Sequence, residues 1–446
     1  MSSAAEQLAA NMNFGAFSKA TELKNRIWFT LGALIVYRLG TYIPLPGIDP
    51  VILNDIFARQ SGGILGMFDM FSGGALGRMT IFALNIMPYI SASIIMQLMT
   101  SISPSLGALK KEGESGRKII NQYTRYGTVV ITALQAYGIA VGLEGMTSSA
   151  GSAVMDPGLF FRFTTVITLV GGTMFLMWLG EQITARGVGN GISLIIFSGI
   201  VANLPQAVAG TLELSRTGAL SPLLIVALLI MSVAVIFFII FMERAQRRII
   251  VQYPKRQQGN KMTGGESSHL PLKLNTAGVI PPIFASSILL MPVTIIGFAA
   301  GQGPEWLSTV AALLGRGQPL YLTIYVSLIV FFAFFYTAVV FNPEDTADNL
   351  KKYGGFVPGI RPGKNTSKYL DKVLTRLTVI GAAYLVFVCL LPEILISRFS
   401  VPFYFGGTSL LIVVTVTLDT VAQIQSHLLA HQYEGLIKKS KLKGRR

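Results

Sequence analysis

The sequence predicts an all-α protein that crosses a membrane many times, and three observations lead to this fold class. Charged residues make up only 13% of the chain, whereas soluble domains contain roughly 25%. Uncharged residues gather in runs of about 20, the length that a helix needs to cross the hydrocarbon core of a bilayer. Lysine and arginine recur between these runs instead of forming one basic tail. A chain with these features is a polytopic membrane protein rather than a set of soluble domains.

Ten apolar runs are long enough to be membrane spans. The fifth is the weakest, because Asn203 and Pro205 interrupt it. An even number of spans places both ends of the chain on the same side of the membrane. In chain order the predicted spans are residues 24–43, 79–102, 123–143, 160–179, 190–209, 221–242, 276–299, 319–341, 373–391 and 404–425.

The distribution of positive charge predicts which side that is. Most of the 36 lysine and arginine residues lie in segments that share a side with the N-terminus. The opposite side carries only scattered arginines, such as Arg162 and Arg316. Cytoplasmic loops of membrane proteins carry an excess of lysine and arginine, so both termini are predicted to be cytoplasmic.

Two of the predicted cytoplasmic loops are longer than the topology requires. Residues 243–275 contain "ERAQRRIIVQYPKRQQGNKM", and residues 342–372 contain "NPEDTADNLKKYGGFVPGIRPGKNTSKYLDK". Each has about 30 residues, and long loops on one face commonly carry function. We predict that they dock a cytoplasmic partner. Anchoring to lipid headgroups is the alternative.

A short apolar stretch, "MFDMFSGGALGR" (residues 67–78), separates the first two spans. It is too short to cross a bilayer, yet it is more apolar than a surface loop needs to be. Gly73 and Gly74 interrupt it, and Arg78 ends it. Composition alone predicts a half-buried loop on the outer side.

The chain lacks the features of two other classes of membrane protein. Proton-coupled carriers place carboxylates or histidines at depth, but the ionisable candidates here are Arg38 and Asp419, both near span ends. The motifs HExxH, GxSxG and GxxxxGK[ST] are absent from the sequence. His427 and His431 share a helix face without a third metal ligand. We therefore expect no catalytic residue, no metal and no cofactor.

Proline and glycine inside the spans bear on the same choice of class. Pro88, Pro281 and Pro282 lie within apolar runs. Membrane helices tolerate such residues where neighbouring helices or a water-filled cavity satisfy the freed backbone groups. This favours a channel, with a solute carrier and an intramembrane enzyme as alternatives. Ordinary helix kinks in a passive scaffold would give the same sequence pattern.

Several long motifs follow one another in a characteristic order. They include "FALNIMPYISASIIMQLM" (82–99), "KKEGESGRKI" (110–119), "HLPLKLNTAGVIPPIFASSI" (269–288), "FFYTAVVFNPEDTADNLKKYGGFVPGIRPG" (334–363) and "VPFYFGGTSLLIVV" (401–414). From about Arg26 to its end, the chain closely resembles the bacterial SecY family, the large subunits of protein-conducting translocons.

The resemblance implies a detailed architecture. Ten helices would form two inverted, pseudo-symmetric halves around a central hourglass pore, with a lateral gate between spans 2–3 and 7–8 and a short re-entrant plug helix below the pore. The implied parts are a cytoplasmic N-terminal segment (1–23), an N-terminal half (24–209) with the plug at about 64–77, a C-terminal half (210–425) with loops 243–275 and 342–372, and a basic cytoplasmic tail (426–446).

The resemblance also implies four sets of site residues. The pore ring maps onto Ile86, Ile90, Ile196, Ile283 and Ile412. The plug maps onto Met67, Phe68, Met70, Phe71, Gly73 and Gly74, with the glycine pair as a hinge. The polar lateral-gate candidates are Asn85, Ser91, Gln97 and Asn275. The partner-docking candidates are Arg247, Arg248, Lys255, Arg256, Lys261 and Arg361.

Three residues stay unexplained by the resemblance. Asn85 stands beside the pore ring, and Asp69 is a charge among the residues expected to seal the pore. Asn260 replaces one member of a basic pair found in some relatives, so one partner contact is expected to be weaker there.

The resemblance implies a membrane partner set and a location. SecE and SecG would be the small membrane subunits, and either the SecA motor ATPase or the translating ribosome would dock the cytoplasmic loops. Signal sequences, nascent chains and membrane lipids are expected ligands, with SecDF-YajC and YidC as candidate accessory partners. The location implied is the bacterial inner membrane. Because the chain shows no nucleotide-binding motif, it is not predicted to be an enzyme.

Overall fold

The computed structural model describes most of the predicted membrane region. The described residues are 21–53, 69, 72–145, 147–148, 151–217, 221–253, 256–258, 261–263, 267–299, 309, 313, 318–399 and 407–443. They belong to two compact units, one made of Met1–Gln206, Leu290–Ala312 and Val416–Arg446, and the other of Ala207–Leu289 and Leu313–Thr415. The predicted division into halves at 209/210 stays a prediction.

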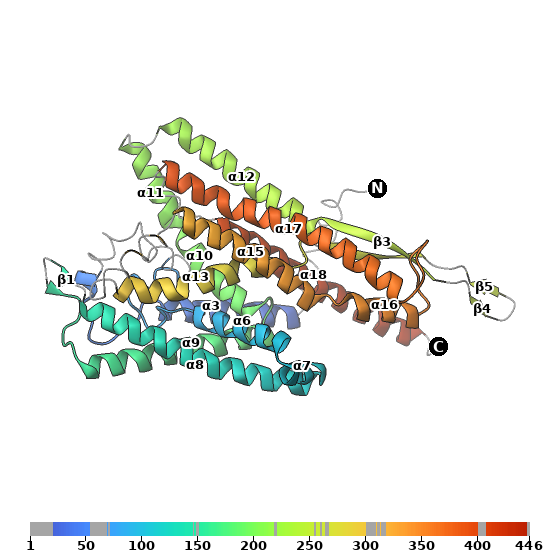
Figure 1. The fold of residues 1–446 in the computed structure, drawn as a ribbon, viewed down its shortest axis with the longest axis horizontal. Helices are drawn as coiled ribbons and strands as arrows, with labels where there is room; N and C mark the ends of the chain where they lie inside the picture. The colour runs from blue at the N-terminus through green and yellow to red at the C-terminus, as the bar shows by residue number, and fades with distance from the viewer. Residues whose placement is uncertain are drawn as a thin grey trace. The chain divides into compact units, whose positions relative to one another are not determined.

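The first unit is built mainly from long helices (Figure 1). α8 packs along α9, α6 packs on α8, and α10 packs against both α9 and α3. Its helices are α3 (Thr21–Gly40), α6 (Met87–Ile102), α7 (Pro104–Lys111), α8 (Glu114–Gly145), α9 (Leu159–Arg186) and α10 (Gly191–Ala202), and β1 (Thr147–Ser148) pairs with β2 (Gly151–Ser152).

Local sequence explains where these helices begin and break. α6 has a proline in its first turn and ends at Ser103, whose extended backbone precedes Pro104 of α7. The two helices meet at a bend of 99°. Proline needs no N–H partner in a first turn, but the residue before it is disfavoured in the helical region. The "SP" pair therefore ends one helix and starts another.

The fifth predicted span is interrupted at one residue without such a bend. α10 begins at Asn190, whose side chain accepts hydrogen bonds from the N–H groups of Ile192 and Ser193. It ends at Ala202, and α11 (Leu204–Arg216) continues with Pro205 in its first turn. The interruption that weakens this span in the sequence is thus confined to Asn203, and Gly191–Glu213 still counts as one helix of membrane-spanning length.

The second unit combines apolar helices with a β-ribbon. α17 packs against α12, α15 and α16, and β3 pairs with β6. Figure 1 shows α15 and α17 side by side. Its elements are α12 (Pro222–Arg244), β3 (Gln246–Gln252), β4 (Arg256–Gln258), β5 (Lys261–Thr263), β6 (Ser267–Lys273), the first half of α13 (Ile280–Ala299), α15 (Pro319–Val340), α16 (Pro343–Lys352), α17 (Lys364–Phe399) and the start of α18 (Gly407–Lys443).

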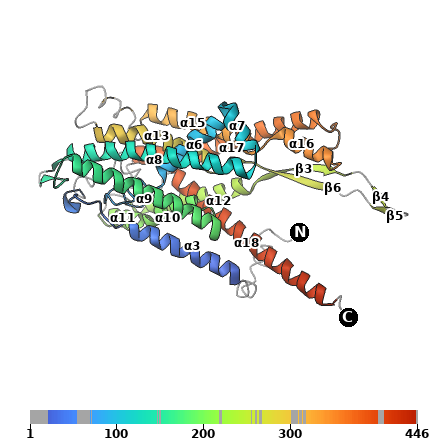
Figure 2. The same ribbon diagram turned by 90° about the horizontal axis from the view of Figure 1, so that it is seen from below.

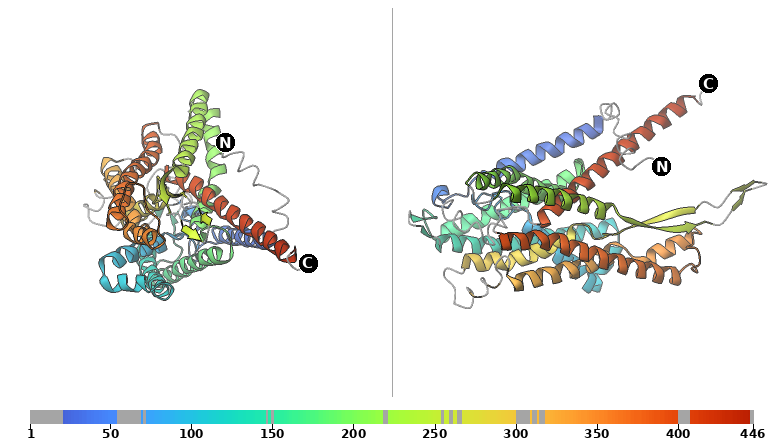
Figure 3. Two further views of the ribbon diagram at one scale, coloured as in Figure 1. Left: turned by 90° about the vertical axis from the view of Figure 1, so that its right-hand side faces the viewer. Right: turned by 90° about the horizontal axis from the view of Figure 1, so that it is seen from above.

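The two long predicted loops contain regular structure. β3 runs antiparallel to β6, with Gln246 opposite Lys273 and Gln252 opposite Ser267. Figures 2 and 3 show this pair as a twisted ribbon that continues from α12. Gln252 also exchanges two backbone hydrogen bonds of 2.9 Å with Phe356. The segments 243–275 and 342–372 are therefore joined.

An apolar cluster lies beneath this ribbon, and we call it the hairpin cluster. Its buried members come from β3, β6, the turn after α16 and the first half of α17. They are Ile249, Leu272, Val357, Leu370, Val373 and Leu377. Burial of apolar surface makes the ribbon and α17 one packed body.

The structure confirms the fold class predicted from the sequence, a mostly helical membrane protein. Seven helices of the described chain are long and apolar enough to span a membrane, and the bent pair of α6 and α7 can add an eighth. Each of the ten predicted spans contains a helix. The count of ten spans and the plug helix stay predictions, and the paired strands are an addition that the sequence did not predict.

Candidate functional site

The five predicted pore-ring isoleucines are all buried. Ile86, Ile90 and Ile196 belong to the first unit, whereas Ile283 and Ile412 belong to the second. The N–H of Ile90 donates to the carbonyl of Ile86 over 3.2 Å, so these two residues are one helical turn apart. This agrees with the shared face expected from their spacing. Whether the five residues form a ring stays a prediction.

Asn85, one of the unexplained residues, occupies a special backbone position. It has a φ of 50°, in the left-handed region that asparagine enters more readily than most residues. Its N–H donates to the carbonyl of Phe82 over 2.8 Å, which closes a turn just before α6. Its buried side chain hydrogen-bonds to the hydroxyl of Tyr37 in α3. Asn85 therefore connects the start of α6 to α3.

The other gate candidates differ in how firmly they are held. Ser91 is buried in α6. Nε2 of Gln97 makes a long contact of 3.4 Å to the hydroxyl of Ser93 in the same helix. These two candidates and Asn85 belong to the first unit, and Asn275 belongs to the second.

Asn275 lies in a polar joint between three elements of the second unit. Its Nδ2 donates to Oε1 of Glu243, at the end of α12, over 2.8 Å and to the carbonyl of Gly278 over 3.0 Å. Its Oδ1 accepts from the N–H of Gly278 over 3.1 Å. The hydroxyl of Tyr384, in α17, lies 3.4 Å from the same Glu243 oxygen. Asn275 thus anchors the turn that leads into α13.

Only the end of the predicted plug can be described. Met67, Phe68, Met70 and Phe71 lie outside the described residues. Gly73 and Gly74 have φ values of 68° and 83°, which glycine adopts without the steric penalty that a Cβ brings.

The side chain of Asp69 contacts the residues that follow it, Ser72 and Gly77. Its Oδ1 accepts from the N–H of Gly77 over 2.6 Å and from the hydroxyl of Ser72 over 3.3 Å. Burial raises the pKa of this carboxyl, opposed in part by these hydrogen bonds and by the charge of Arg78. The carboxyl group of Asp69 thus closes a turn at the end of the plug.

The docking candidates lie on and near the β-ribbon. Arg247 and Arg248 are exposed on β3, and Arg361 is exposed in the segment between α16 and α17. Lys255 and Asn260 lie outside the described residues. Arg256 belongs to β4 and Lys261 to β5, which pair with each other. Reasoning from the sequence missed the hairpin cluster that joins these segments, although the β-branched run in "RRIIVQ" and the alternating leucines in "HLPLKL" carried a strand signal.

A glycine-rich turn links α9 to α10. The sequence "GVGNG" (187–191) lacks the following lysine and the preceding strand of a phosphate loop, so it predicts a flexible lead into span 5. The structure shows close packing instead. The N–H of Val188 donates to the hydroxyl of Thr30 over 3.0 Å, and the N–H of Gly189 donates to Oε1 of Gln423 over 2.8 Å. A Cβ at Gly187 or Gly191 would overlap backbone atoms of α9.

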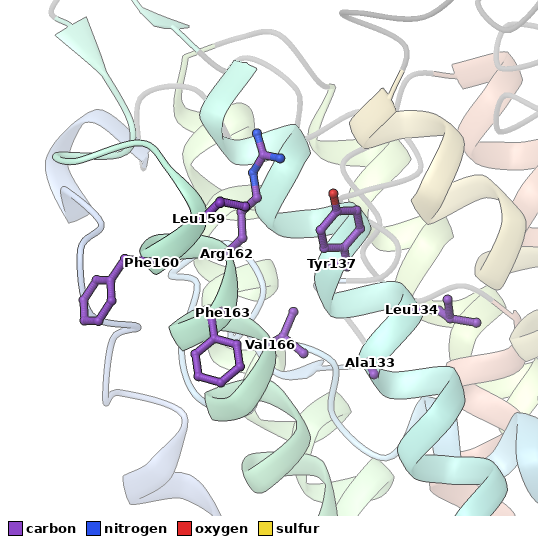
Figure 4. Close-up of a pocket in the computed structure, with 8 residues that line it drawn as sticks. All are labelled: Ala133, Leu134, Tyr137, Leu159, Phe160, Arg162, Phe163 and Val166. Atoms are coloured by element: carbon purple, nitrogen blue, oxygen red, sulfur yellow. The ribbon is translucent and has the colours of Figure 1, made fainter.

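An apolar groove lies between α8 and α9 (Figure 4). Arg162 at its edge pairs with Glu144 over 2.6 Å, so its charge is already neutralised. Such a groove suits hydrocarbon chains better than a polar solute. Its lining residues are Ala133, Leu134, Tyr137, Leu159, Phe160, Arg162, Phe163 and Val166.

Solved structures share this arrangement of helices. A protein-conducting channel superimposes with a TM-score of 0.67 and 18% identity, covering 91% of this chain and 92% of the other. Sec61 in the canine ribosome-channel complex from the endoplasmic reticulum gives a TM-score of 0.64, again with 18% identity and with the same coverage. The fold thus places the chain in the class of polytopic helical membrane proteins built like protein-conducting channels.

Sequence comparison defines the particular family. The sequence model of SecY matches residues 80–421. "Protein translocase subunit SecY" of Escherichia coli (strain K12) is 59% identical over 424 residues, covering 95% of this chain and 96% of that protein. The protein of the same name from Vibrio cholerae is 57% identical over 433 residues, covering 96% and 97%. This chain belongs to the SecY family.

Proposed function

We propose that this chain is the central subunit of a protein-conducting channel in the bacterial inner membrane. It passes unfolded secretory polypeptides across the membrane and releases apolar helices sideways into the lipid. The observation that carries the proposal is its identity of 57% or more, over nearly its whole length, with proteins named "Protein translocase subunit SecY". The fold of a solved protein-conducting channel supports it.

The proposed pore constriction is made of isoleucine side chains. Narrow apolar constrictions resist wetting, so they hold back ions when no chain is passing. They also offer a passing polypeptide no hydrogen bonds that would retain it. Burial of all five candidates supports their assignment to the protein interior rather than to the lipid face. They are Ile86, Ile90, Ile196, Ile283 and Ile412.

The proposed lateral gate sorts segments by their affinity for lipid. An apolar residue at the centre of a membrane helix gains about 0.3–0.6 kcal/mol in lipid, whereas a charged residue costs about 3 kcal/mol. A signal sequence therefore opens the seam between spans 2–3 and 7–8 and displaces the plug. Polar side chains at Asn85, Ser91, Gln97 and Asn275 keep this seam weaker than an apolar one.

Energy comes from a partner, because the sequence has no nucleotide-binding motif. SecA or the translating ribosome docks the basic segments around Arg247, Arg248 and Arg361, whose exposure supports this role. Ribosomal RNA would be held largely by phosphate charge. A structural neighbour named for its complex with the canine ribosome supports this choice. SecE and SecG are the proposed small membrane subunits.

A crosslinking experiment tests the pore assignment. Cys389 is the only cysteine in the sequence, so Cys389→Ser gives a background for Ile283→Cys. A secretory chain stalled in the channel should crosslink to position 283. The matched control is Ile230→Cys, because Ile230 is 62% exposed on α12. Equal crosslinking at both positions, or none at position 283 while translocation is active, would contradict the proposal.

Both termini are proposed to be cytoplasmic, following the positive-inside rule. Topology reporters fused near residues 150 and 260 should report opposite sides of the membrane. Reporters on the same side would rule out the ten-span topology.

A further inference from the structure

Two arginines converge on one backbone oxygen at the end of the plug segment. Nη1 of Arg38, in α3, donates to the carbonyl of Gly73 over 3.1 Å, and Nη2 of Arg78 donates to the same oxygen over 3.2 Å. The guanidinium of Arg78 lies 4.2 Å from the centre of the Tyr42 ring, and that of Arg38 lies 5.5 Å from it. We call Arg38, Tyr42, Gly73 and Arg78 the root clamp.

The chemistry of the root clamp favours a firm hold on this carbonyl. Hydrogen bonds from a charged donor are shorter and stronger than neutral ones. Two like charges repel each other at this distance, but the face of an aromatic ring attracts both of them. Nη2 of Arg38 also lies 3.4 Å from the Tyr42 hydroxyl. Tyr42 thus lets two cations share one acceptor.

Steric contacts hold the same backbone from other directions. A Cβ at Gly73 would lie 2.9 Å from Cα of Gly199, in α10, so the two backbones are in close contact. The neighbouring Ser72 is fully buried, and its carbonyl accepts from the hydroxyl of Tyr37 over 3.3 Å. Elements α3 and α10 therefore both grip the backbone at residues 72 and 73.

This packing changes how the glycine pair is understood. A hinge needs backbone that can rotate freely, but the left-handed backbone at Gly73 is fixed by two arginines and by α10. The left-handed conformation explains why glycine is required there, without any need for motion.

We propose that Arg38 and Arg78 are positioning residues that hold the root of the plug in place while the channel is open. Residues 72–74 then keep their position when the plug is displaced, so the Gly73–Gly74 pair is not the hinge. This inference rests on the proposed function, because it requires a plug that moves during transport.

Thiol labelling tests whether residue 72 keeps its position when the plug moves. In the Cys389→Ser background, Ser72→Cys and Met67→Cys are labelled with a membrane-impermeant maleimide, in the idle channel and with a stalled secretory chain. Engagement should raise the labelling rate at position 67 about tenfold and leave position 72 protected, since protection follows the local opening of the backbone. Position 72 labelled as fast as position 67 in the engaged channel would overturn the inference.

A second arm tests the two arginines. The pair Arg38→Gln and Arg78→Gln should raise labelling at position 72 about tenfold through local opening and increase idle ion conductance, with an unchanged melting temperature. The control is Arg162→Gln, which breaks an arginine contact of 2.6 Å to Glu144 in the same unit. It should leave both readouts as they are.

A conservative variant covers the case in which the double variant does not accumulate. Arg78→Lys keeps the charge but loses the planar fork and its stacking, so labelling at position 72 should rise several-fold. Unchanged labelling in every variant that accumulates would overturn the inference. The stalled-chain crosslink at Ile283→Cys separates failure of this inference from failure of the proposed function. The crosslink would persist if only the role of the root clamp were wrong, and it would be lost if the chain were not a protein-conducting channel.

Discussion

The root clamp of the first unit and the hairpin cluster of the second hold functional segments by different forces. At the clamp, a few directional contacts act on one carbonyl, that of Gly73. In the hairpin cluster, six buried apolar side chains hold two segments that are distant in sequence. Hydrogen bonds break one at a time and have strict geometry, whereas apolar burial is non-directional and scales with area. The first arrangement suits a point that must stay in one place, and the second suits a surface built from two segments that are distant in sequence.

The largest effect should come from opening a cavity in the hairpin cluster. Leu370 is completely buried in α17, and Leu370→Ala should lower the free energy of unfolding by about 2–5 kcal/mol. The loss should appear as a lower melting temperature and as weaker binding of SecA, the proposed partner, to vesicles containing the channel. Leu229→Ala, at an exposed position on α12, is the control. If Leu370→Ala had no more effect than the control, the ribbon and α17 would not form one body.

A smaller effect is expected from adding a methyl group at the root clamp. Gly73→Ala places a Cβ 2.9 Å from both Cα of Gly199 and Nη1 of Arg38. It also forces a left-handed backbone on alanine, at a cost of about 1–2 kcal/mol. Idle ion conductance should rise several-fold. Gly171→Ala in α9 meets no atom within 4 Å and should leave the conductance unchanged. An equal response in both variants would remove the special role of position 73.

The smallest effect should be a pH dependence at Asp69. Burial raises the pKa of this carboxyl, so the protonated form is favoured when the turn is closed. Its contribution to stability is then full below the ordinary value near about 4 and is lost as the pH rises through the raised pKa. Thiol ionisation by itself speeds up labelling as the pH rises, so the rate at Ser72→Cys is divided by the rate at a fully exposed cysteine at the same pH. This relative rate should rise with pH in that window.

Asp69→Asn separates charge from hydrogen bonding at the same position. Asparagine keeps an acceptor for the Gly77 N–H but has no proton to lose. The pH dependence of the relative labelling rate, corrected for thiol ionisation, should vanish in this variant. A dependence that persists would assign the titration to another group.

Composition and motif order were sufficient for the membrane class and the family. Runs of about 20 uncharged residues have few alternatives to a transmembrane helix, because each backbone group must be satisfied within the segment. The break in the fifth span was visible for the same reason, since Pro205 cannot continue a helix without a lost hydrogen bond. The strands at 246–252 and 267–273 were missed because their pairing depends on partners about 20 residues away along the chain.

The candidate sites show the same limit at the level of single residues. The spacing of Ile86 and Ile90 was enough to place them on one helix face. The roles of Asp69 and Asn85 could not be found this way, because their partners are defined by turns and by a helix, α3, that is distant in sequence. The sequence shows that Asp69 is a charged residue within an apolar stretch, but it does not show that its carboxyl group accepts a hydrogen bond from the N–H of Gly77.

The sequence by itself determined the helical membrane class, the charge bias and the membership of the SecY family, because these depend on composition and on local order. Only the tertiary structure decided that two arginines hold the carbonyl of Gly73 and that Asn275 fixes the turn before α13. It also decided that the segments 243–275 and 342–372 share one apolar core. Each of these depends on which distant groups meet. Contact between distant groups follows from packing of the whole unit, not from the pattern of any one segment.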